Sequence, residues 1–303
     1  MAQWTFDDIP DHSGRTAVVT GANTGIGFET ARMLAAKGAQ VTLACRDADR
    51  AAGAAERIRA TGVPGTVTCA PLDLADLDSV AAFAEAYRAG HDRLDLLINN
   101  AGVMAPPLGR TRQGFELQIG INHLGHFALT GRLLPLLLAA GPGARVVSVS
   151  SGAHRAGRID FDDLNWQRRR YRRWAAYGQS KLANLLFTRE LQHRLTGAGS
   201  PVRATAAHPG WTATELTRHT VSVAARIGQL VAMTPHDGAL PTLRAATDPT
   251  AAGGSYWGPG RPLGLSGPPV AVGCSAAARD DATARRLWTE SEQLTGVSFP
   301  APA

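Results

Sequence analysis

Short apolar runs alternate with longer amphipathic stretches along most of the chain. Runs such as Ala17-Val18-Val19 are apolar throughout, which is typical of strands buried on both faces of a parallel sheet. The longer stretches repeat apolar residues at helical spacing. Strands are expected near residues 15–20, 40–45, 66–70, 94–99, 145–150 and 202–207, and helices near 25–36, 48–60, 77–89, 113–139 and 175–195. This alternation predicts an α/β fold with a doubly wound parallel sheet flanked by helices.

The domain organisation follows from the absence of a dividing segment. No composition shift or linker interrupts the chain before about residue 250, and no repeat recurs at a fixed period. The length allows two domains, but the pattern predicts a single domain over residues 1–303. Residues 251–269 are rich in Gly and Pro and are expected to be irregular. A helix is expected near 276–294, so residues 251–303 should pack back on the core.

Charge changes the picture only locally. The net charge is +6, and five arginines lie between residues 168 and 173. That run could be a solvated loop, a contact for an anionic substrate or cofactor, or a surface for nucleic acid or membrane. No nucleic-acid-binding motif accompanies it, so no nucleic-acid partner is expected. The most apolar window, residues 129–140, is shorter than the roughly 20 residues that span a membrane, so no span is expected either.

Cysteine content and the N-terminus indicate the compartment. The 3 cysteines are Cys45, Cys69 and Cys274, and no C-x-x-C pair occurs. We therefore expect neither a structural zinc nor any other metal site, and reduced thiols. The first residues carry no secretory signal pattern. These features predict a cytoplasmic protein.

A glycine-rich loop directly follows the first predicted strand. It reads Thr20-Gly21-Ala22-Asn23-Thr24-Gly25-Ile26-Gly27 and leads at once into a helical pattern. Glycines let the backbone approach a pyrophosphate, whose charge is stabilised by the N–H groups at the helix N-terminus. The spacing G-x-x-x-G-x-G is a variant of the usual fingerprint, so the loop alone could also be a plain turn. Within a βαβ unit it predicts a Rossmann-type dinucleotide site.

The end of the second strand bears on which dinucleotide binds. Arg46 stands where the chain leaves this strand, and its guanidinium is able to pair with a 2′-phosphate. We therefore expect NADP(H) rather than NAD(H). Asp47 is adjacent and could instead face the ribose hydroxyls. Asp73, followed by Leu74, ends the third strand and is expected to bond the adenine amino group. The alternative for Asp73 is a cap on the next helix.

Tyr177 and Lys181 form the one Tyr-x-x-x-Lys pair among the 4 tyrosines. On a helix these positions share a face, so the ammonium is expected near the phenol. A neighbouring positive charge favours the phenolate and lowers the tyrosine pKa. Tyr177 is therefore a candidate general acid or base, whereas a surface helix pair is the alternative.

Two further polar features accompany this pair. Ser150 and Ser151 end a predicted strand at the carboxyl edge of the sheet, where open α/β folds bind ligands. A hydroxyl there is able to stabilise a developing alkoxide, although the serines could merely finish the strand. Asn122 falls inside a long apolar helical pattern, an unfavourable place for a side chain that competes for backbone hydrogen bonds. We therefore expect it to have a polar role.

Together these segments resemble the classical type of the short-chain dehydrogenase/reductase family over roughly residues 15–250. The resemblance rests on the glycine loop, Asn99-Asn100-Ala101-Gly102, Asn122, Ser151, Tyr177-x-x-x-Lys181 and Pro209-Gly210. More narrowly, the chain resembles the retinol-dehydrogenase-like branch. The segments that carry this resemblance are Ala44-Cys45-Arg46-Asp47, His123-Leu124-Gly125-His126-Phe127, Tyr177-Gly178-Gln179-Ser180-Lys181-Leu182-Ala183-Asn184, His208-Pro209-Gly210 and Leu287-Trp288-x-x-Ser291.

The resemblance implies an NADP(H)-dependent oxidoreductase that interconverts a carbonyl and an alcohol. Tyr177 would move the proton, Lys181 would lower its pKa and hold the ribose, and Ser151 would orient the carbonyl. Asn122 would support a water relay. Ser151 is preferred to Ser150 because the second serine is usually the catalytic one, although the long spacing to Tyr177 leaves the register open. The cofactor would meet Gly21, Asn23, Thr24, Gly25, Ile26, Gly27, Arg46, Asp73, Leu74, Asn100, Ala101, Gly102, Tyr177, Lys181, Pro209, Gly210, Thr212 and Thr214.

The substrate and the assembly are less constrained. Residues 212–235 are apolar at roughly helical spacing and are expected to form a lid over a medium or large apolar substrate, with a core helix as the alternative. Two rival functions remain, a reductase of an activated C=C bond and a non-catalytic NADP(H)-binding regulator. Members of the family often pair through the helices near 113–139 and 175–195. A homodimer or homotetramer is therefore expected, although the branch also includes apparent monomers.

Overall fold

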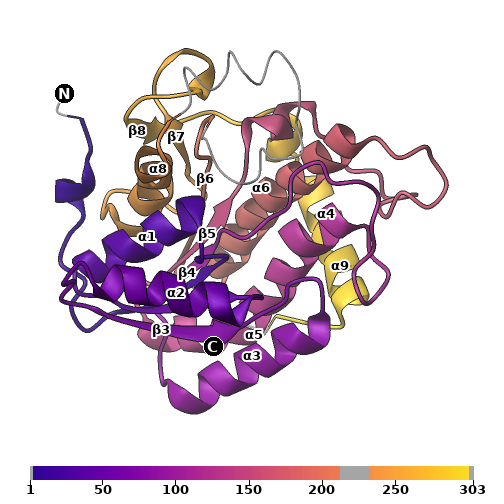
Figure 1. Cartoon of the computed structure of the whole chain (residues 1–303). Helices are drawn as coiled ribbons and strands as arrows, with labels where there is room; N and C mark the ends of the chain where they lie inside the picture. Colours follow the sequence, from indigo (N-terminus) through magenta and orange to yellow (C-terminus); the bar gives the residue numbers. More distant parts are fainter. Residues whose placement is uncertain (1–2, 212–232, 300–303) are drawn as a thin grey trace.

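All the strands in the described part of the chain belong to one 8-stranded sheet. The computed structural model describes residues 3–211 and 233–299. Strand order is β3-β2-β1-β4-β5-β6-β7-β8, with parallel pairing except between β7 and β8 (Figure 1). The strands are β1 (Thr16–Thr20), β2 (Gln40–Cys45), β3 (Thr66–Pro71), β4 (Leu96–Asn99), β5 (Arg145–Val149), β6 (Arg203–Ala207), β7 (Tyr256–Pro259) and β8 (Pro269–Ala271). The predicted doubly wound α/β sheet is confirmed.

Helices cover both faces of the sheet, and alternate residues of β1 face opposite layers. Ala17 and Val19 pack with α1, α2 and α8, whereas Val18 packs with α3, α5 and α6. All three side chains are fully buried, as expected for a parallel strand between two helical layers. The helices are α1 (Gly25–Ala36), α2 (Ala48–Arg59), α3 (Leu77–Gly90), α4 (Leu117–Ile119), α5 (His126–Ala140), α6 (Arg173–Gly197), α8 (Pro235–Thr247) and α9 (Asp281–Thr295).

Short polar side chains fix where several helices begin. Asp47, Asp76 and Thr234 accept hydrogen bonds from first-turn N–H groups of α2, α3 and α8. Helix α1 differs, because its N-cap residue Thr24 forms no such side-chain bond within the described chain. No side-chain cap therefore competes for the N-terminus of α1, the end of the helix that attracts anions.

The long helix expected over residues 113–139 is interrupted in the structure. Helix α4 begins only at Leu117, because the backbone of Glu116 is not helical and its side chain caps the helix by accepting hydrogen bonds from two first-turn N–H groups. A π-helical segment, Gly120–Gly125, then separates α4 from α5. The predicted single helix was therefore wrong at its start and in its regularity. The interruption matters because it contains Asn122.

The C-terminal third holds elements that the sequence pattern did not predict. Within the Gly- and Pro-rich stretch, β7 pairs in parallel with β6 and β8 closes the sheet edge. A Cβ on Gly258 in β7 would overlap the His208 ring, so the glycine that weakens the strand signal is required by a long-range contact. Helix α8 begins at Pro235, where the lid was expected to end. The expectation of irregular structure over residues 251–269 was thus partly wrong.

Helix α9 carries the C-terminal segment back onto the core, as expected. Trp288 is only 2% exposed and packs among three aromatic rings. Its ring stacks on Phe187 of α6 at 5.8 Å between centroids and lies 4.3 Å from that of Phe299. Phe127 of α5 completes the cluster at 5.1 Å. The tail therefore lies over both α5 and α6.

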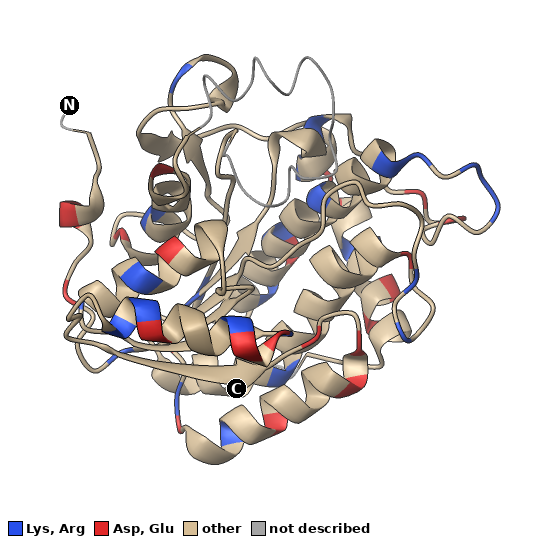
Figure 2. Ribbon diagram, in the orientation of Figure 1, with Lys and Arg blue, Asp and Glu red and all other residues tan. Residues whose placement is uncertain are grey.

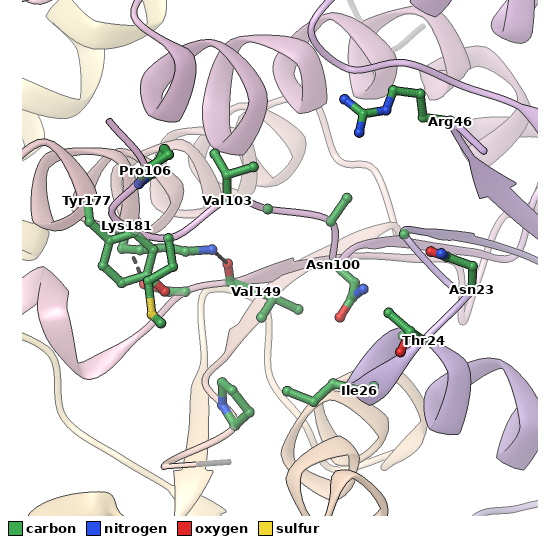
Figure 3. A pocket seen from close by; sticks show the side chains of 18 residues that line it. Asn23, Thr24, Ile26, Arg46, Asn100, Val103, Pro106, Val149, Tyr177 and Lys181 are labelled. Atoms are coloured by element: carbon green, nitrogen blue, oxygen red, sulfur yellow. Dashed lines mark hydrogen bonds between the residues drawn. The ribbon is translucent and has the colours of Figure 1, made fainter. Parts of the chain in front are cut away.

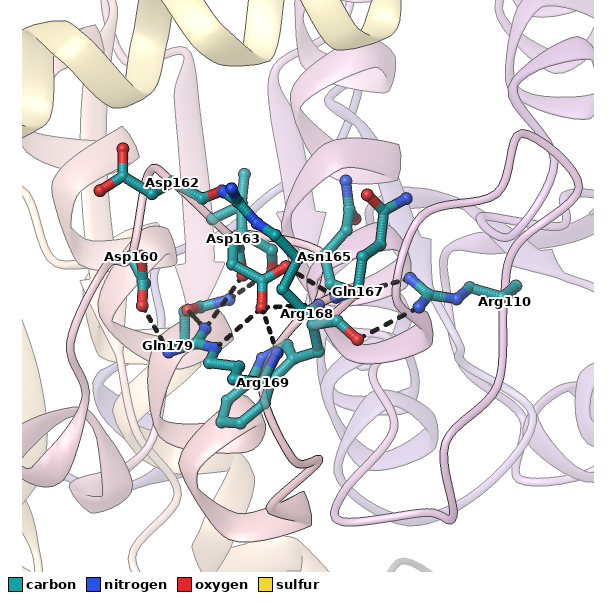
Figure 4. Close-up of polar contacts among 11 residues, drawn as sticks. Arg110, Asp160, Asp162, Asp163, Asn165, Gln167, Arg168, Arg169 and Gln179 are labelled. Carbon is teal, nitrogen blue, oxygen red and sulfur yellow. Dashed lines mark hydrogen bonds and ion pairs between the residues drawn. The ribbon is translucent and has the colours of Figure 1, made fainter.

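The arginine run lies in the loop before α6 and ends at Arg173, the first residue of that helix; Figure 2 shows the positive residues along the loop. Arg169 is held within the loop: its guanidinium carbon is 3.6 Å from the centroid of the Trp166 ring, and it pairs with Asp160 at 2.9 Å and Asp163 at 3.6 Å (Figure 4). Arg168 donates to the carbonyl of Asp162. Arg168 and the three arginines that follow Arg169 are solvent-exposed. The solvated-loop interpretation therefore fits most of the run, and Arg169 stabilises the loop.

Two expectations meet the limits of the described chain. Thr212, Thr214 and most of the expected lid at 212–235 lie outside the described residues, so the lid stays a prediction. Within residues 3–211 and 233–299, no helix has both the length and the apolar character needed to cross a membrane.

Candidate active site

A cleft of about 500 Å³ lies along the carboxyl ends of the central strands. Figure 3 shows Arg46 at one end of it and Tyr177 with Lys181 at the other. The cleft brings together most of the expected cofactor residues, namely Gly21, Asn23, Thr24, Gly25, Ile26, Gly27, Arg46, Asn100, Ala101, Gly102, Tyr177, Lys181 and Pro209. Residues from five strands or their following loops thus converge on one elongated site, the place where open α/β sheets bind ligands.

The glycine loop is shaped by close backbone approach. Gly21 has φ +64°, and a Cβ there would lie 2.9 Å from the Cβ of Ala101. At Gly27 a Cβ would overlap the side-chain nitrogen of Asn100 and lie 2.5 Å from the Gly21 carbonyl oxygen. Larger residues would therefore displace the loop that follows β4. Together with the uncapped N-terminus of α1, this cradle fits the pyrophosphate of a dinucleotide.

Thr20 ties the glycine loop to the Asn99-Asn100-Ala101-Gly102 segment. Its hydroxyl accepts hydrogen bonds from the N–H groups of Asn100 and Ala101, each at 2.9 Å. Asn100 Nδ2 also donates to the Thr20 carbonyl at 2.8 Å. These bonds connect the ends of β1 and β4, so Thr20 holds the two sides of the cofactor cradle together.

At the end of the cleft far from Tyr177, the neighbouring residues Arg46 and Asp47 have different roles. Arg46 is exposed and lines the cleft, and no other described residue forms an ion pair with it. Asp47 is occupied, because its carboxylate accepts the Arg50 N–H at 3.0 Å and pairs with the Arg50 side chain at 3.4 Å. The alternative in which Asp47 faces the ribose thus competes with its role as the cap of α2. A guanidinium in this position suits a phosphate monoester.

Asp73 and Leu74 do not line the cleft. Asp73 Oδ1 accepts the Ala75 N–H at 2.9 Å, and its own N–H donates to the Ser79 hydroxyl. The carboxylate thus stabilises the turn that leads into α3, close to the capping role that the sequence left open, although the cap itself is Asp76. Gly210 is likewise absent from the cleft lining, since it packs against Leu265.

Tyr177 and Lys181 lie on α6, both deeply buried. Lys181 Nζ donates to the Val149 carbonyl at 2.9 Å and lies 5.8 Å from the centroid of the Tyr177 ring. Burial lowers the pKa of Lys181 to about 8 and raises the pKa of Tyr177 to about 12. The expected lowering of the Tyr177 pKa by Lys181 is not seen, because desolvation is the largest cause of the shift and raises this pKa.

The serine pair divides into two different environments. Ser150 Oγ donates to the Lys181 carbonyl at 2.8 Å and is committed to the backbone of α6. Ser151 follows β5, and its hydroxyl accepts the Ala153 N–H at 3.2 Å. The Ser151 side chain lowers the pKa of Tyr177 and partly offsets the effect of burial on it. Ser150 lines the cleft, whereas Ser151 does not, so the choice of Ser151 as the catalytic serine stays a prediction that its effect on Tyr177 favours.

Asn122 acts on the cleft wall from behind. Its Oδ1 accepts the Val103 N–H at 2.8 Å, and its Nδ2 donates to the Val103 carbonyl and to the Ser180 hydroxyl. The side chain therefore fixes the segment after β4 against α6, and it does not line the cleft. The sequence analysis missed four residues that do line it: Val103, Met104, Pro106 and Val149. The sequence indicates these residues only through their position next to the Asn99–Gly102 motif and the serine pair.

Residues 15–224 match the family model described as short chain dehydrogenase. The chain belongs to this family. Human retinol dehydrogenase 13 is 45% identical over 298 residues, covering 95% of this chain and 86% of the relative. The crystal structure of an uncharacterized protein from Mycobacterium paratuberculosis is 48% identical with a TM-score of 0.82, covering 99% and 100% of the two chains. An NADP complex of RhlG from Pseudomonas aeruginosa is 28% identical with a TM-score of 0.65, covering 81% and 94%.

These similarities make this short-chain dehydrogenase an oxidoreductase of the retinol-dehydrogenase-like branch, within a family that uses nicotinamide cofactors. The cleft gives an independent reason to expect a nicotinamide cofactor. Its glycine cradle, uncapped helix N-terminus and elongated shape fit a dinucleotide that extends from Arg46 to Tyr177.

Proposed function

We propose that this short-chain dehydrogenase is an NADP(H)-dependent enzyme that interconverts a ketone or aldehyde and an alcohol on a medium or large apolar substrate. The observation that carries the proposal is the presence of Tyr177 and the buried Lys181 together in the cleft lining, with the Ser151 side chain close enough to lower the pKa of Tyr177. A proton donor, a second hydroxyl and an ammonium group together suit a reaction in which negative charge develops on a carbonyl oxygen.

The side chains divide the proton and charge work between them. Tyr177 donates its proton to the substrate oxygen during reduction and accepts it during oxidation. Ser151 stabilises the developing alkoxide and fixes the direction of the carbonyl. Lys181 favours the phenolate of Tyr177, and its ammonium holds a ribose hydroxyl. NADP(H), when bound, supplies or takes up the hydride. Asn122 keeps the cleft wall in place through its bonds to Val103 and Ser180. It would also support the proposed water relay from its place in the π-helical turn.

The preference for NADP(H) over NAD(H) is supported by the opposite end of the cleft. Arg46 offers its guanidinium to a 2′-phosphate, whereas Asp47 is occupied as a helix cap. An acidic residue free to bind both ribose hydroxyls is the usual mark of NAD sites, and Asp47 is not free. The NADP complex of the RhlG relative agrees with this preference.

An apolar substrate is supported by the wall near Tyr177. Val103, Met104 and Pro106 line the cleft there. Retinol dehydrogenase 13, by its name, acts on an apolar alcohol, and the resemblance suggests a substrate of that kind without identifying retinol. The lid expected over residues 212–235 would cover this side.

Compartment and assembly complete the proposal. Cys45, Cys69 and Cys274 are free thiols, which suits the cytoplasm that the sequence analysis expects. A homodimer or homotetramer through α5 and α6 would have to accommodate α9, because α9 packs on α6 and Phe299 packs against Gly131 of α5. Light scattering at several protein concentrations measures the assembly directly.

Consumption of NADPH with a panel of apolar ketones, aldehydes and quinones tests the proposed activity, with Tyr177→Phe as the matched variant. We expect turnover by the wild type and a loss of about 100-fold or more in the variant, while NADPH binding persists. A saturated ketone as product would instead favour reduction of a C=C bond. Tight NADPH binding without turnover of any compound, together with an unchanged cellular role for Tyr177→Phe, would favour the regulator.

A further inference from the structure

The π-helical segment leaves the carbonyl of Asn122 without its usual helical partner. In a regular α-helix the N–H of His126 would donate to this carbonyl. Here the His126 N–H donates to the His123 carbonyl instead. The Nδ1 atom of the His126 ring lies 3.1 Å from the Asn122 oxygen. The imidazole of His126 thus takes the place of its own backbone N–H.

The other ring nitrogen of His126 meets the cofactor cradle. Nε2 lies 2.9 Å from the hydroxyl of Thr20. That hydroxyl already accepts two N–H groups, from Asn100 and Ala101, so both of its lone pairs are used. Its single hydrogen must therefore point to His126 Nε2 or to the Ile98 carbonyl, which is farther away at 3.3 Å.

This arrangement determines the tautomer of His126. Because Nε2 accepts the Thr20 hydrogen, the ring proton resides on Nδ1 and is donated to the Asn122 carbonyl. The ring is 3% exposed, and burial lowers the pKa of His126 to about 4. The neutral imidazole is thus a fixed link with one acceptor end and one donor end.

Each end of the link belongs to a different part of the site. The Thr20 end connects to Asn100 and Ala101, which line the cofactor side of the cleft. The Asn122 end connects through its side chain to Val103, in the wall next to Tyr177, and to Ser180 on α6. His126 itself does not line the cleft, so it acts only through these neighbours.

We propose that His126 is a positioning residue whose imidazole couples the cofactor cradle at Thr20 to the catalytic turn at Asn122. The proposal rests on the proposed function, because it concerns two halves of one reaction site. The neutral ring holds the cradle through its Nε2 end and the catalytic turn through its Nδ1 end. Loss of the Thr20 contact should therefore affect cofactor binding, and loss of the Asn122 contact should affect turnover.

Two substitutions separate these contacts. His126→Asn places an amide N–H near the position of Nδ1 and retains the donor to Asn122, but it removes the acceptor for Thr20. His126→Gln places an amide oxygen near the position of Nε2 and retains that acceptor, but it removes the donor. Both variants shorten or remove the ring, so a purely structural role would lower the melting temperature in both and leave the functional constants similar.

The expected results are opposite for the two variants. His126→Asn should raise the Kd for NADPH about tenfold, measured by fluorescence of the bound nucleotide, and keep kcat within about threefold of wild type. His126→Gln should keep the Kd and lower kcat about tenfold. Equal effects of both substitutions on both constants would overturn the proposal. If no carbonyl substrate is turned over by the wild type, the proposed function fails while the NADPH comparison still tests the Thr20 half.

A measurement on the wild type covers the case in which neither variant folds. Nitrogen NMR of ¹⁵N-histidine-labelled protein distinguishes the two neutral tautomers of a buried imidazole. We expect His126 to carry its proton on Nδ1, and Thr20→Val, which removes the hydroxyl with little change of shape, should change the Nε2 signal. A proton on Nε2 in the wild type would contradict the proposed link.

Discussion

Tyr177 and Lys181 lie one turn apart on α6, and burial disfavours the charged form of each side chain. The two residues are 7% and 4% exposed. Desolvation raises the pKa of Tyr177 to about 12 and lowers the pKa of Lys181 to about 8. Lys181 donates to the Val149 carbonyl, and the Ser151 side chain partly offsets the effect of burial on the pKa of Tyr177. Because burial disfavours the Lys181 ammonium and the Tyr177 phenolate, the free energy of unfolding should depend on pH through both groups.

The first prediction concerns this pH dependence. The folded pKa of Lys181, about 8, lies below its ordinary value of 10.5, so between these values the unfolded chain binds more protons. The free energy of unfolding should therefore rise with pH across this window, by about 3 kcal/mol in total for this group. Tyr177 acts oppositely only above its ordinary value of 10. Urea unfolding of the cofactor-free protein from pH 7 to pH 10 measures the slope.

Lys181→Met supplies the control for this titration. Methionine has a similar length and carries no charge, so the variant should lose most of the rise between pH 8 and pH 10. At pH 7 it should be more stable than the wild type, because the buried ammonium is gone. An identical slope in both proteins would show that other groups cause the pH dependence.

The second prediction concerns Arg46 and the choice of cofactor. Arg46→Ala removes the guanidinium at the cleft end, so the Kd for NADPH should rise about 10- to 100-fold, as expected for loss of a charge-assisted contact to phosphate. The Kd for NADH should change less than threefold. Arg285→Ala on α9 removes the same charge from an exposed site outside the cleft and should change neither constant. Equal losses for NADPH and NADH would argue against a 2′-phosphate contact.

The central sheet was predictable because its signals are local. Strands such as β1 are apolar on both faces, and residues such as Asp47 mark helix starts in the sequence. The break between α4 and α5 was not predictable, because its cause is tertiary. A Cβ on Gly125 would lie 2.5 Å from the Leu74 carbonyl oxygen, so the helix is shaped by close packing that no window of sequence reveals.

The site was predictable to a similar extent. Tyr177, Lys181 and the glycine loop were recognisable from spacing, since each motif acts within a few residues. Asp73 was placed toward the adenine from its position at a strand end, but in the structure its carboxylate serves the turn before α3. Position along the chain indicates which edge of the sheet a residue occupies, and side-chain direction depends on local hydrogen bonds that the sequence does not specify.

The third prediction compares two glycines. Gly27→Ala would force its Cβ against the Asn100 side chain and the Gly21 carbonyl, so NADPH binding should weaken at least tenfold. Gly53→Ala, in the middle of α2, has no other atom within 4 Å of the added Cβ and should raise the free energy of unfolding by about 1 kcal/mol. Isothermal titration with NADPH and urea unfolding of both variants make the comparison. Normal NADPH affinity in Gly27→Ala would contradict the close-approach argument for the cradle.

The last prediction concerns Trp288, which joins α9 to the core away from the cleft. It is 2% exposed, and its ring packs with those of Phe127, Phe187 and Phe299. Trp288→Ala should therefore lower the free energy of unfolding by about 3–5 kcal/mol through lost burial and a cavity. The indole N–H has no hydrogen-bond partner among the described residues, so Trp288→Phe leaves no acceptor unpaired and should cost much less.

These two variants also test whether α9 affects the reaction. Trp288 does not line the cleft, so both proteins should keep kcat/KM near the wild-type value at temperatures well below their melting points. The catalytic turn is not fully independent of α9, however. His123 lies next to Asn122, and its Nε2 atom forms a hydrogen bond with Ser291 of α9 at 2.8 Å. If Trp288→Phe remains folded but loses more than about tenfold in kcat, then the position of α9 controls the catalytic turn through this bond. Retained activity with lowered stability would instead confine α9 to holding the fold together.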